Sequence, residues 1–237
     1  MAYGVYQRKS TMLSWLLFLC FYTAGSSCVP AQVSSSIAPG AAKVQIDNER
    51  VAVSDATLSP GKSESLDTYR CDFVTMFLTD GTFQITDMNG RSRVVTHRAG
   101  EATFTPKGSD RSEKVTSDQP VMIVRVELKR YPASPSINKT KYPDAFPRPG
   151  SIKVFENDHV VIWNYAWTSG VPTPTHYHYR DLVVVYREDG TLKATSENGE
   201  SVVTDHTVGE FRFVKAGKTH YEELEKGKES AIILELK

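Results

Sequence analysis

Three histidines in the C-terminal half of the chain have the spacing of a metal-ligand set. His176 and His178 lie one residue apart in THYHYRDLVVVYREDG (175–190), and His220 follows further along. The β-branched run after His178 favours a strand, in which residues i and i+2 point to the same face. A third histidine from a neighbouring strand would complete three neutral nitrogen ligands, which suit Fe, Ni, Cu, Mn or Zn and leave positions open. The alternative is a polar pocket that binds a ligand without metal.

The elements that must position these histidines come from an internal repeat. VQIDNERVAVSDATLSPG (44–61) aligns with KVFENDHVVIWNYAWTSG (153–170) at an offset of 109 residues, and the same offset superposes several Asp-Gly and Asn-Gly pairs. Near the end the offset slips by one residue, so that VELK (126–129) meets LELK (234–237). A repeat at a fixed offset indicates a duplicated structural unit. We therefore expect two domains, 44–130 and 151–237, joined by a Pro-rich linker over 131–150.

Each copy reads as a series of short strands. Runs such as VTMFL, VMIVRVEL, LVVVY and AIILEL are bounded by DG, NG and GK turn signals. No long segment has the 3.6-residue apolar period of a helix. The pattern predicts an all-β chain with one sandwich or small barrel, such as a jelly roll, in each copy.

The motifs of the second copy resemble those of the cupin superfamily. They read Gly170-x5-His176-x-His178, then Gly190, then Gly209-x5-Lys215-x-Gly217-x2-His220. The match extends over both copies, so the chain resembles a bicupin with two tandem jelly-roll β-barrels. The resemblance implies that the three histidines bind a divalent transition metal and that the first copy is metal-blind, because its ligand positions hold Asp67, Tyr69, Val74 and Arg111. The second copy departs from the family pattern at the glutamate ligand, the motif proline and the closing asparagine, where it has Val183, Lys215 and Leu224.

The duplication allows each residue to be compared with its counterpart. A residue present in both copies, one of which lacks ligands, is predicted to serve folding. Asp181 is matched by Asp72, which favours a turn or strand-end hydrogen bond over metal ligation. The same comparison assigns structural roles to two further pairs, His206 with His97 and Glu222 with Glu113. The three candidate ligands have no such counterparts.

Three aromatic residues precede the first candidate ligand at alternate positions. Trp163, Tyr165 and Trp167 share one face of the expected strand, whereas the first copy has Ser54, Ala56 and Leu58 there. These side chains could form a stacking wall for a ring or sugar beside the site. Packing between the two barrels is an equally good interpretation.

The first 31 residues have the form of a secretory signal peptide. Arg8 and Lys9 precede MLSWLLFLCFYTA, which is too short to span a membrane, and small residues before Gln32 suit cleavage after Ala31. Simple export to the periplasm or the medium is favoured over a lipid anchor on Cys28. Cleavage there removes Cys20 and Cys28, so Cys71 is expected to be alone, without a disulfide.

Composition and site chemistry together bound the function. Lys and Arg number 28, as do Asp and Glu, which gives no basic surplus for nucleic acid. The expected partner is a small molecule, and the resemblance to cupins also allows a homodimer. We expect a metal-dependent protein of dioxygenase-like or isomerase-like activity on a small substrate, anionic because the site lacks the family's carboxylate. The alternative is a non-catalytic module that binds a sugar or other small molecule, with optional metal.

Overall fold

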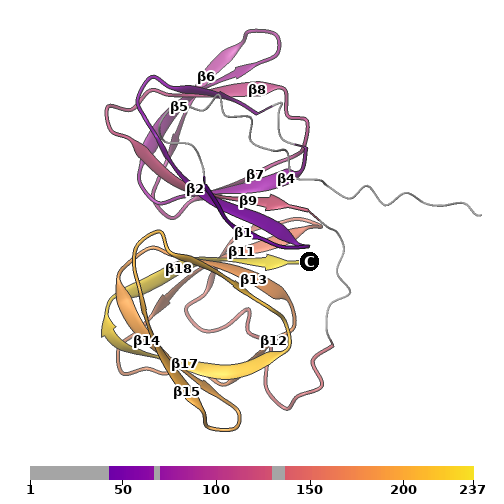
Figure 1. Cartoon of the computed structure of the whole chain (residues 1–237), viewed down its shortest axis with the longest axis vertical. Coiled ribbons are helices and arrows are strands. Elements are labelled where there is room, and N and C mark those ends of the chain that lie inside the picture. The colour runs from indigo at the N-terminus through magenta and orange to yellow at the C-terminus, as the bar shows by residue number, and fades with distance from the viewer. Residues whose placement is uncertain (1–42, 67–69, 130–136) are drawn as a thin grey trace, which may run out of the picture.

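The structure, a computed structural model, describes residues 43–66, 70–129 and 137–237, and within them every regular element is a β-strand. The strands form two barrels stacked on one another (Figure 1). The N-terminal barrel contains β1 (Lys43–Asp47), β2 (Val51–Leu58), β3 (Ser63–Ser65), β4 (Asp72–Phe77), β5 (Gly81–Asp87), β6 (Ser92–His97), β7 (Ala102–Thr105), β8 (Arg111–Val115) and β9 (Val121–Leu128). The C-terminal barrel contains β10 (Ile152–Glu156), β11 (Val160–Trp167), β12 (His176–His178), β13 (Asp181–Tyr186), β14 (Gly190–Ser196), β15 (Ser201–His206), β16 (Phe211–Val214), β17 (Lys218–Gly227) and β18 (Glu229–Leu236).

The two barrels have the same topology. Each pairs a five-stranded sheet, ordered β1-β2-β9-β4-β7 or β10-β11-β18-β13-β16, with a four-stranded sheet, ordered β3-β8-β5-β6 or β12-β17-β14-β15. Most strands of one barrel begin 109 residues before their counterparts in the other, as β2 and β11 do. The all-β prediction is confirmed, and the sequence repeat corresponds to a repeat in structure.

The glycines that recur in both copies have two physical reasons. Gly100 and Gly209 adopt φ values of 90° and 84°, which residues with a Cβ rarely tolerate. Gly81 and Gly190 have ordinary φ values, but their neighbours leave no space for a side chain. A Cβ at Gly81 would lie 2.4 Å from a Val121 methyl, and one at Gly190 would lie 2.6 Å from the Glu229 carboxylate. The repeated glycines therefore mark turns and close approaches that the fold requires.

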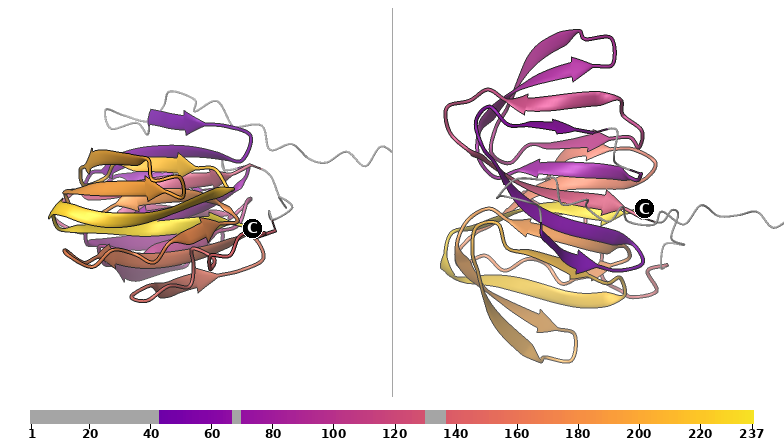
Figure 2. Two further views of the ribbon diagram at one scale, coloured as in Figure 1. Left: turned by 90° about the horizontal axis from the view of Figure 1, so that it is seen from below. Right: turned by 45° about the horizontal axis from the view of Figure 1, so that its top comes forward.

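The two five-stranded sheets pack face to face between the barrels, as the views in Figure 2 show. Alternate residues of their central strands form one apolar cluster that draws on both copies. Its members are almost fully buried: Val51, Val53, Val74, Met76, Val124, Val126 and Leu128 from the N-terminal barrel, and Val160, Ile162, Val183, Val185, Ile232, Leu234 and Leu236 from the C-terminal barrel. We call this cluster the inter-barrel core. Because each barrel covers the other's sheet, neither can expose this surface without loss of hydrophobic stabilisation.

Ionisable residues flank the inter-barrel core in symmetry-related pairs. Arg50 lies 3.9 Å from Asp181 across the interface, and His159 lies 3.7 Å from Asp72. Asp181 also accepts a hydrogen bond from the backbone N–H of Ala216 (2.8 Å), as Asp72 does from Lys107 (2.7 Å). The prediction that Asp181 serves strand-end hydrogen bonding is confirmed.

Part of the predicted linker packs into the C-terminal barrel. Ala145 and Phe146 are buried with its aromatic core. The Ala145 N–H donates to the Tyr177 carbonyl (2.9 Å), and the Tyr177 N–H donates to the Pro143 carbonyl (2.8 Å). Pro143, Pro147 and Pro149 of the predicted linker lie in this segment, which forms a bridge to β12 between Asp144 and Tyr177. We call residues 143–151 the strap.

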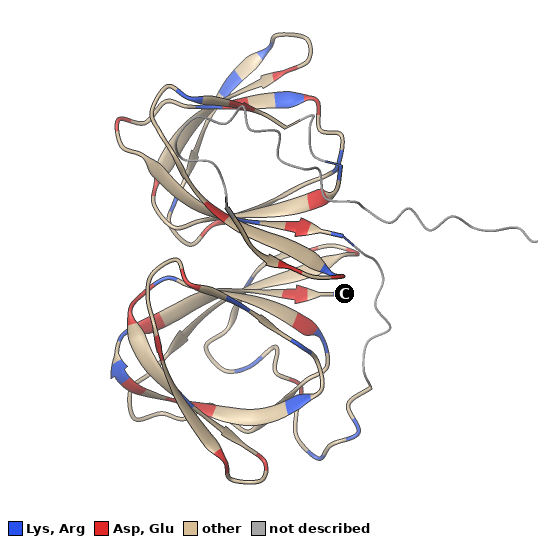
Figure 3. Cartoon of the chain, in the orientation of Figure 1, with Lys and Arg blue, Asp and Glu red and all other residues tan. Residues whose placement is uncertain are grey.

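Charges are distributed over both barrels (Figure 3). Many are paired locally, as in Lys153 with Glu156 (2.6 Å) and Lys193 with Glu223 (3.1 Å). Within the described residues, no helix has the length and apolar character needed to cross a membrane.

The predicted signal peptide (1–31) and Cys28 lie outside the described residues. One expectation attached to them is wrong, because Cys71 is disulfide-bonded. The sequence contains three cysteines, so a chain cut after Ala31 would retain no partner for Cys71.

The inter-barrel core predicts that the two barrels unfold together. Met76→Ala in the N-terminal barrel removes a fully buried side chain from it and should cost about 2–5 kcal/mol. We expect the loss to appear in the urea transition reported by Trp163 and Trp167, which belong to the C-terminal barrel, in a Trp15→Phe background. Met88→Ala is the control, because Met88 is 75% exposed, and should change stability by less than about 0.5 kcal/mol. An unchanged tryptophan transition in Met76→Ala would show that the barrels unfold independently.

Candidate metal centre

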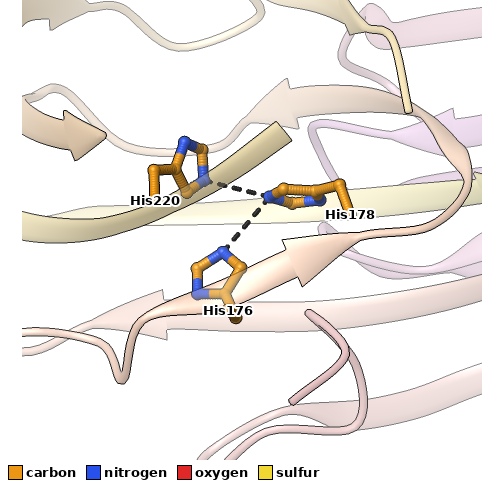
Figure 4. Close-up of side chains that lie close together, drawn as sticks. All are labelled: His176, His178 and His220. Carbon is orange, nitrogen blue, oxygen red and sulfur yellow. Dashed lines mark hydrogen bonds between the residues drawn. The ribbon is translucent and has the colours of Figure 1, made fainter. Parts of the chain in front are cut away.

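Two neighbouring strands bring the predicted ligands together. His176 and His178 are the ends of β12, and His220 lies on β17, which pairs with β12 in antiparallel register so that His176 faces His220. Because residues i and i+2 of a strand share a face, both β12 imidazoles point into the barrel. The three rings converge on one point (Figure 4).

The convergent atoms are the Nε2 nitrogens. His178 Nε2 lies 3.2 Å from His176 Nε2 and 3.0 Å from His220 Nε2, and the ligand atoms of all three residues lie within 4.8 Å of one another. Nitrogens bound to one ion at about 2.1 Å would lie roughly 3–4 Å apart. His176 Nδ1 lies 2.8 Å from the Pro174 carbonyl and donates to it, so that its Nε2 lone pair points at the other rings. Three Nε2 nitrogens that converge on one point fit a divalent transition metal.

The protein keeps these imidazoles neutral. Burial lowers the pKa of His176 to about 4, with Glu222 acting against the shift and Arg148 adding to it. Burial also lowers the pKa of His178 well below its usual range, and it lowers the pKa of His220. Neutral imidazole is the form that binds metal.

The N-terminal barrel has no matching cluster among its described residues. Arg111 occupies the position of His220 and bonds Glu113 (3.2 Å) and Thr105 (3.0 Å). Asp67 and Tyr69 lie outside the described residues. A guanidinium in place of an imidazole excludes a metal ligand there.

Arg148 is a site residue that the sequence analysis missed. The strap inserts its guanidinium into the barrel, 3.9 Å from the ring centre of Tyr165 and 4.7 Å from that of Phe146. Its Nη1 lies 3.2 Å from His176 Nε2, and its buried Nε has no hydrogen-bond partner among the described residues. An arginine in a Pro-rich segment carries no sequence signal of this position.

Glu222, which the comparison with Glu113 assigned to folding, is a second residue that lies beside the histidines. Its Oε2 accepts from Trp167 Nε1 (3.0 Å) and lies 3.2 Å from Arg148 Nη1, and its Oε1 lies 3.8 Å from His220 Nε2. Burial alone would raise the pKa of Glu222, but Arg148 and the histidines outweigh it and hold the pKa at about 2. The signal that could have found it is the His220-x-Glu222 spacing, which places both side chains on one strand face.

A small cavity of about 50 Å³ opens beside the histidines. His178, His220, Glu222 and Arg148 supply its polar wall, and Trp167, Tyr186 and Leu182 are among its apolar lining residues. Of the three aromatics on β11, Trp167 reaches the cavity. Trp163 stacks on Phe146 behind it, and Tyr165 lies under Arg148. The three belong to the interior of the C-terminal barrel, so packing between the barrels is not their role.

Strand β13 contributes no ligand to the site. Val183, the residue aligned with the family's glutamate, belongs to the inter-barrel core, whereas its neighbours Leu182 and Val184 line the cavity. The two residues of β13 that face the cavity, Leu182 and Val184, are therefore both apolar. His206 lies apart from the site, stacked on Tyr186 at 3.8 Å as His97 stacks on Phe77 at 4.1 Å, which confirms its structural assignment.

Comparison with known proteins supports the fold. No protein-family model matches the sequence, and no curated protein sequence matches it. Among solved structures, a cupin 2 conserved barrel domain protein from Leptotrichia buccalis aligns with a TM-score of 0.53 and 12% identity over 86% of this chain and 92% of that one. Oxalate decarboxylase from Bacillus subtilis, described with Mn(II) centres, aligns with a TM-score of 0.54 and 13% identity over 79% of this chain and 68% of that one. With two topologically equivalent barrels and a three-histidine cluster in the second, the chain has the cupin fold in its two-barrel form.

Proposed function

We propose that the chain is an exported protein whose C-terminal barrel holds a divalent transition metal on His176, His178 and His220 and acts on a small organic anion. The observation that carries this proposal is the convergence of three Nε2 nitrogens in one of two otherwise equivalent barrels. The fold does not require these histidines, because the other barrel forms without counterparts to them. A ligand site accounts for them.

Arg148 supports an anionic substrate. Its guanidinium places one buried positive charge beside the histidines. A divalent metal would add two positive charges, and the Glu222 carboxylate would neutralise one of the three. A buried excess of positive charge is costly unless a negative group neutralises it. The unpartnered Arg148 Nε–H is a donor that a carboxylate oxygen could accept from.

The cavity sets the size of the substrate. A volume of about 50 Å³ holds only a few non-hydrogen atoms while the strap is in place. Trp167 and Tyr186 line it with ring surface, and an apolar lining of low dielectric strengthens the electrostatic interactions within. A metal in this site would supply a Lewis acid for a carboxylate or carbonyl oxygen, with open positions for substrate. Oxygen uptake with small enols and acids would separate a dioxygenase-like from an isomerase-like reaction, and binding without turnover would indicate the non-catalytic alternative.

Export is supported by two features. The N-terminal pattern is typical of a signal peptide, and Cys71 is disulfide-bonded, which suits an oxidising compartment. Cleavage after Ala31 would remove both possible partners of Cys71. We therefore propose that the mature chain keeps at least one of them, and mass spectrometry of the exported protein would locate its N-terminus.

Removal of two ligands should abolish metal binding. We expect purified wild-type protein to contain about one equivalent of a divalent transition metal, and His176→Ala/His178→Ala to contain at most a tenth of that. Elemental analysis of both proteins provides the measurement. The control is His159→Ala, because the His159 side chain is partly exposed and lies outside the histidine cluster. Equal metal contents in wild type and the double variant would contradict the proposal.

The metal-free protein should lose stability as the pH falls from about 6.5 to 4. The folded pKa of His176 is lowered to about 4, so between these values the unfolded chain binds more protons than the folded one. At pH 5, His176 alone should cost about 2 kcal/mol relative to neutral pH. Urea midpoints at pH 7 and pH 5 test this in the wild type and in His176→Gln. The variant should show a smaller decrease, and an equal decrease in both would rule out His176 as the source.

Arg148→Met should weaken anion binding without loss of the metal. Oxalate is the probe, and we expect its dissociation constant to rise at least tenfold, because a charge-assisted hydrogen bond is lost. Titration calorimetry of the metal-loaded protein measures it, with metal content checked in parallel. Arg180→Met is the matched control, since Arg180 pairs with Glu235 (3.7 Å) away from the cavity. Unchanged oxalate affinity in Arg148→Met, when the wild type binds oxalate, would exclude Arg148 as the anion anchor.

A further inference from the structure

We propose that Glu222 supplies a carboxylate ligand to the metal held by the three histidines, with Arg148 and Trp167 as the residues that position it. The inference rests on the metal site proposed above and assigns a fourth ligand to it. The position of Glu222 on β17, two residues after His220, differs from the β12–β13 position at which the cupin resemblance implies a glutamate.

Strand β13 cannot provide the carboxylate. The cavity-facing residues of this strand are Leu182 and Val184, and Val183 is turned into the inter-barrel core. Asp181, its one acidic residue, is bonded to the Ala216 N–H and faces Arg50. A carboxylate at the metal therefore has to come from another element.

Glu222 presents one oxygen to the site and has the other one fixed. Oε1 lies 3.8 Å from His220 Nε2, which is within the roughly 3–4 Å that separates two ligand atoms of one ion. Among the described residues the ligand atoms within 4.8 Å of one another are those of the three histidines, so Oε1 would move toward His176 and His178 when a metal binds. Oε2 is bonded by Trp167 Nε1 at 3.0 Å and approached by Arg148 Nη1 at 3.2 Å. Hydrogen bonds from outer residues to a ligating carboxylate are what orient it toward a metal.

The backbone of Glu222 is held as firmly as its side chain. Its N–H donates to Thr173 Oγ1 (2.8 Å), and its carbonyl accepts from the Thr173 N–H (2.9 Å). Thr173 precedes β12 and is buried. This clamp ties the residue that carries the carboxylate to the strand that carries two of the histidines.

The N-terminal barrel supplies an independent comparison. There Glu113 occupies the position of Glu222 and pairs with Arg111, the residue in place of His220, at 3.1 Å. In this barrel the carboxylate of Glu113 therefore pairs with a positive charge two residues earlier on the same strand. In the C-terminal barrel His220 takes the place of this arginine, and Arg148 pairs with Oε2 of Glu222 instead, which leaves Oε1 facing His220.

Cobalt(II) binding tests the assignment, because its visible absorption spectrum responds to the number and type of ligands. In Glu222→Gln, which preserves shape and removes the charge, we expect the Co²⁺ dissociation constant to rise at least tenfold and the absorption bands to shift. Glu222→Asp, which keeps a carboxylate on a shorter side chain, should recover part of the affinity. Glu223→Gln is the matched control, since Glu223 pairs with Lys193 outside the cavity and should bind Co²⁺ as the wild type does.

The outcomes separate the two proposals. If wild type binds Co²⁺ through the histidines, and Glu222→Gln matches Glu223→Gln in both affinity and spectrum, Glu222 is not a ligand while the metal site stands. A lower affinity with an unchanged spectrum would also overturn the assignment, because it would reduce Glu222 to a positioning role. Absence of Co²⁺ binding in the wild type would instead refute the metal site itself. Urea midpoints of the metal-free variants establish that each is folded.

Discussion

Face-to-face packing of the two five-stranded sheets is the constraint on which the rest of the structure depends. The central strands of these sheets are buried on both faces, one in the inter-barrel core and the other inside their own barrel. In β13, Val183 and Val185 pack in the inter-barrel core, while Leu182 and Val184 pack inside the C-terminal barrel. With both of its faces committed to apolar contacts, β13 has no position for a polar ligand between Leu182 and Val185. The polar chemistry of the C-terminal barrel accordingly comes from β12, β17 and the strap.

This packing also explains why a barrel without metal ligands is retained. The N-terminal barrel covers half of the inter-barrel core, so the C-terminal barrel depends on it whatever its interior contains. Its interior polar groups are instead paired with one another, as Arg125 is with Glu64 at 2.7 Å. A barrel without metal ligands therefore still presents the same apolar face to the inter-barrel core. One copy can then stabilise the fold while the other carries the candidate metal site.

Sequence alone predicted what backbone geometry dictates. The fixed offset identified the duplication, because turns with positive φ need glycine in both copies, and strand alternation correctly placed His176 and His178 on one face. Spacing alone could not tell which residue of β13 faces inward, since that depends on which face the other barrel covers. Arg148 was beyond reach for a similar reason: a Pro-rich segment indicates extended backbone and does not say what the segment packs against.

The comparison between copies predicted the hydrogen bond of Asp181 but not the position of Glu222 beside the histidines, and the difference is physical. Asp72 and Asp181 accept a backbone N–H that exists in each barrel, so an identical residue has an identical role. Glu113 and Glu222 instead accompany positive charges, and charge is what differs between the copies. A shared residue therefore indicates a shared role only where its partner is the backbone. Where the partner is a side chain or an ion, the same carboxylate can stabilise an arginine in one barrel and belong to a metal centre in the other.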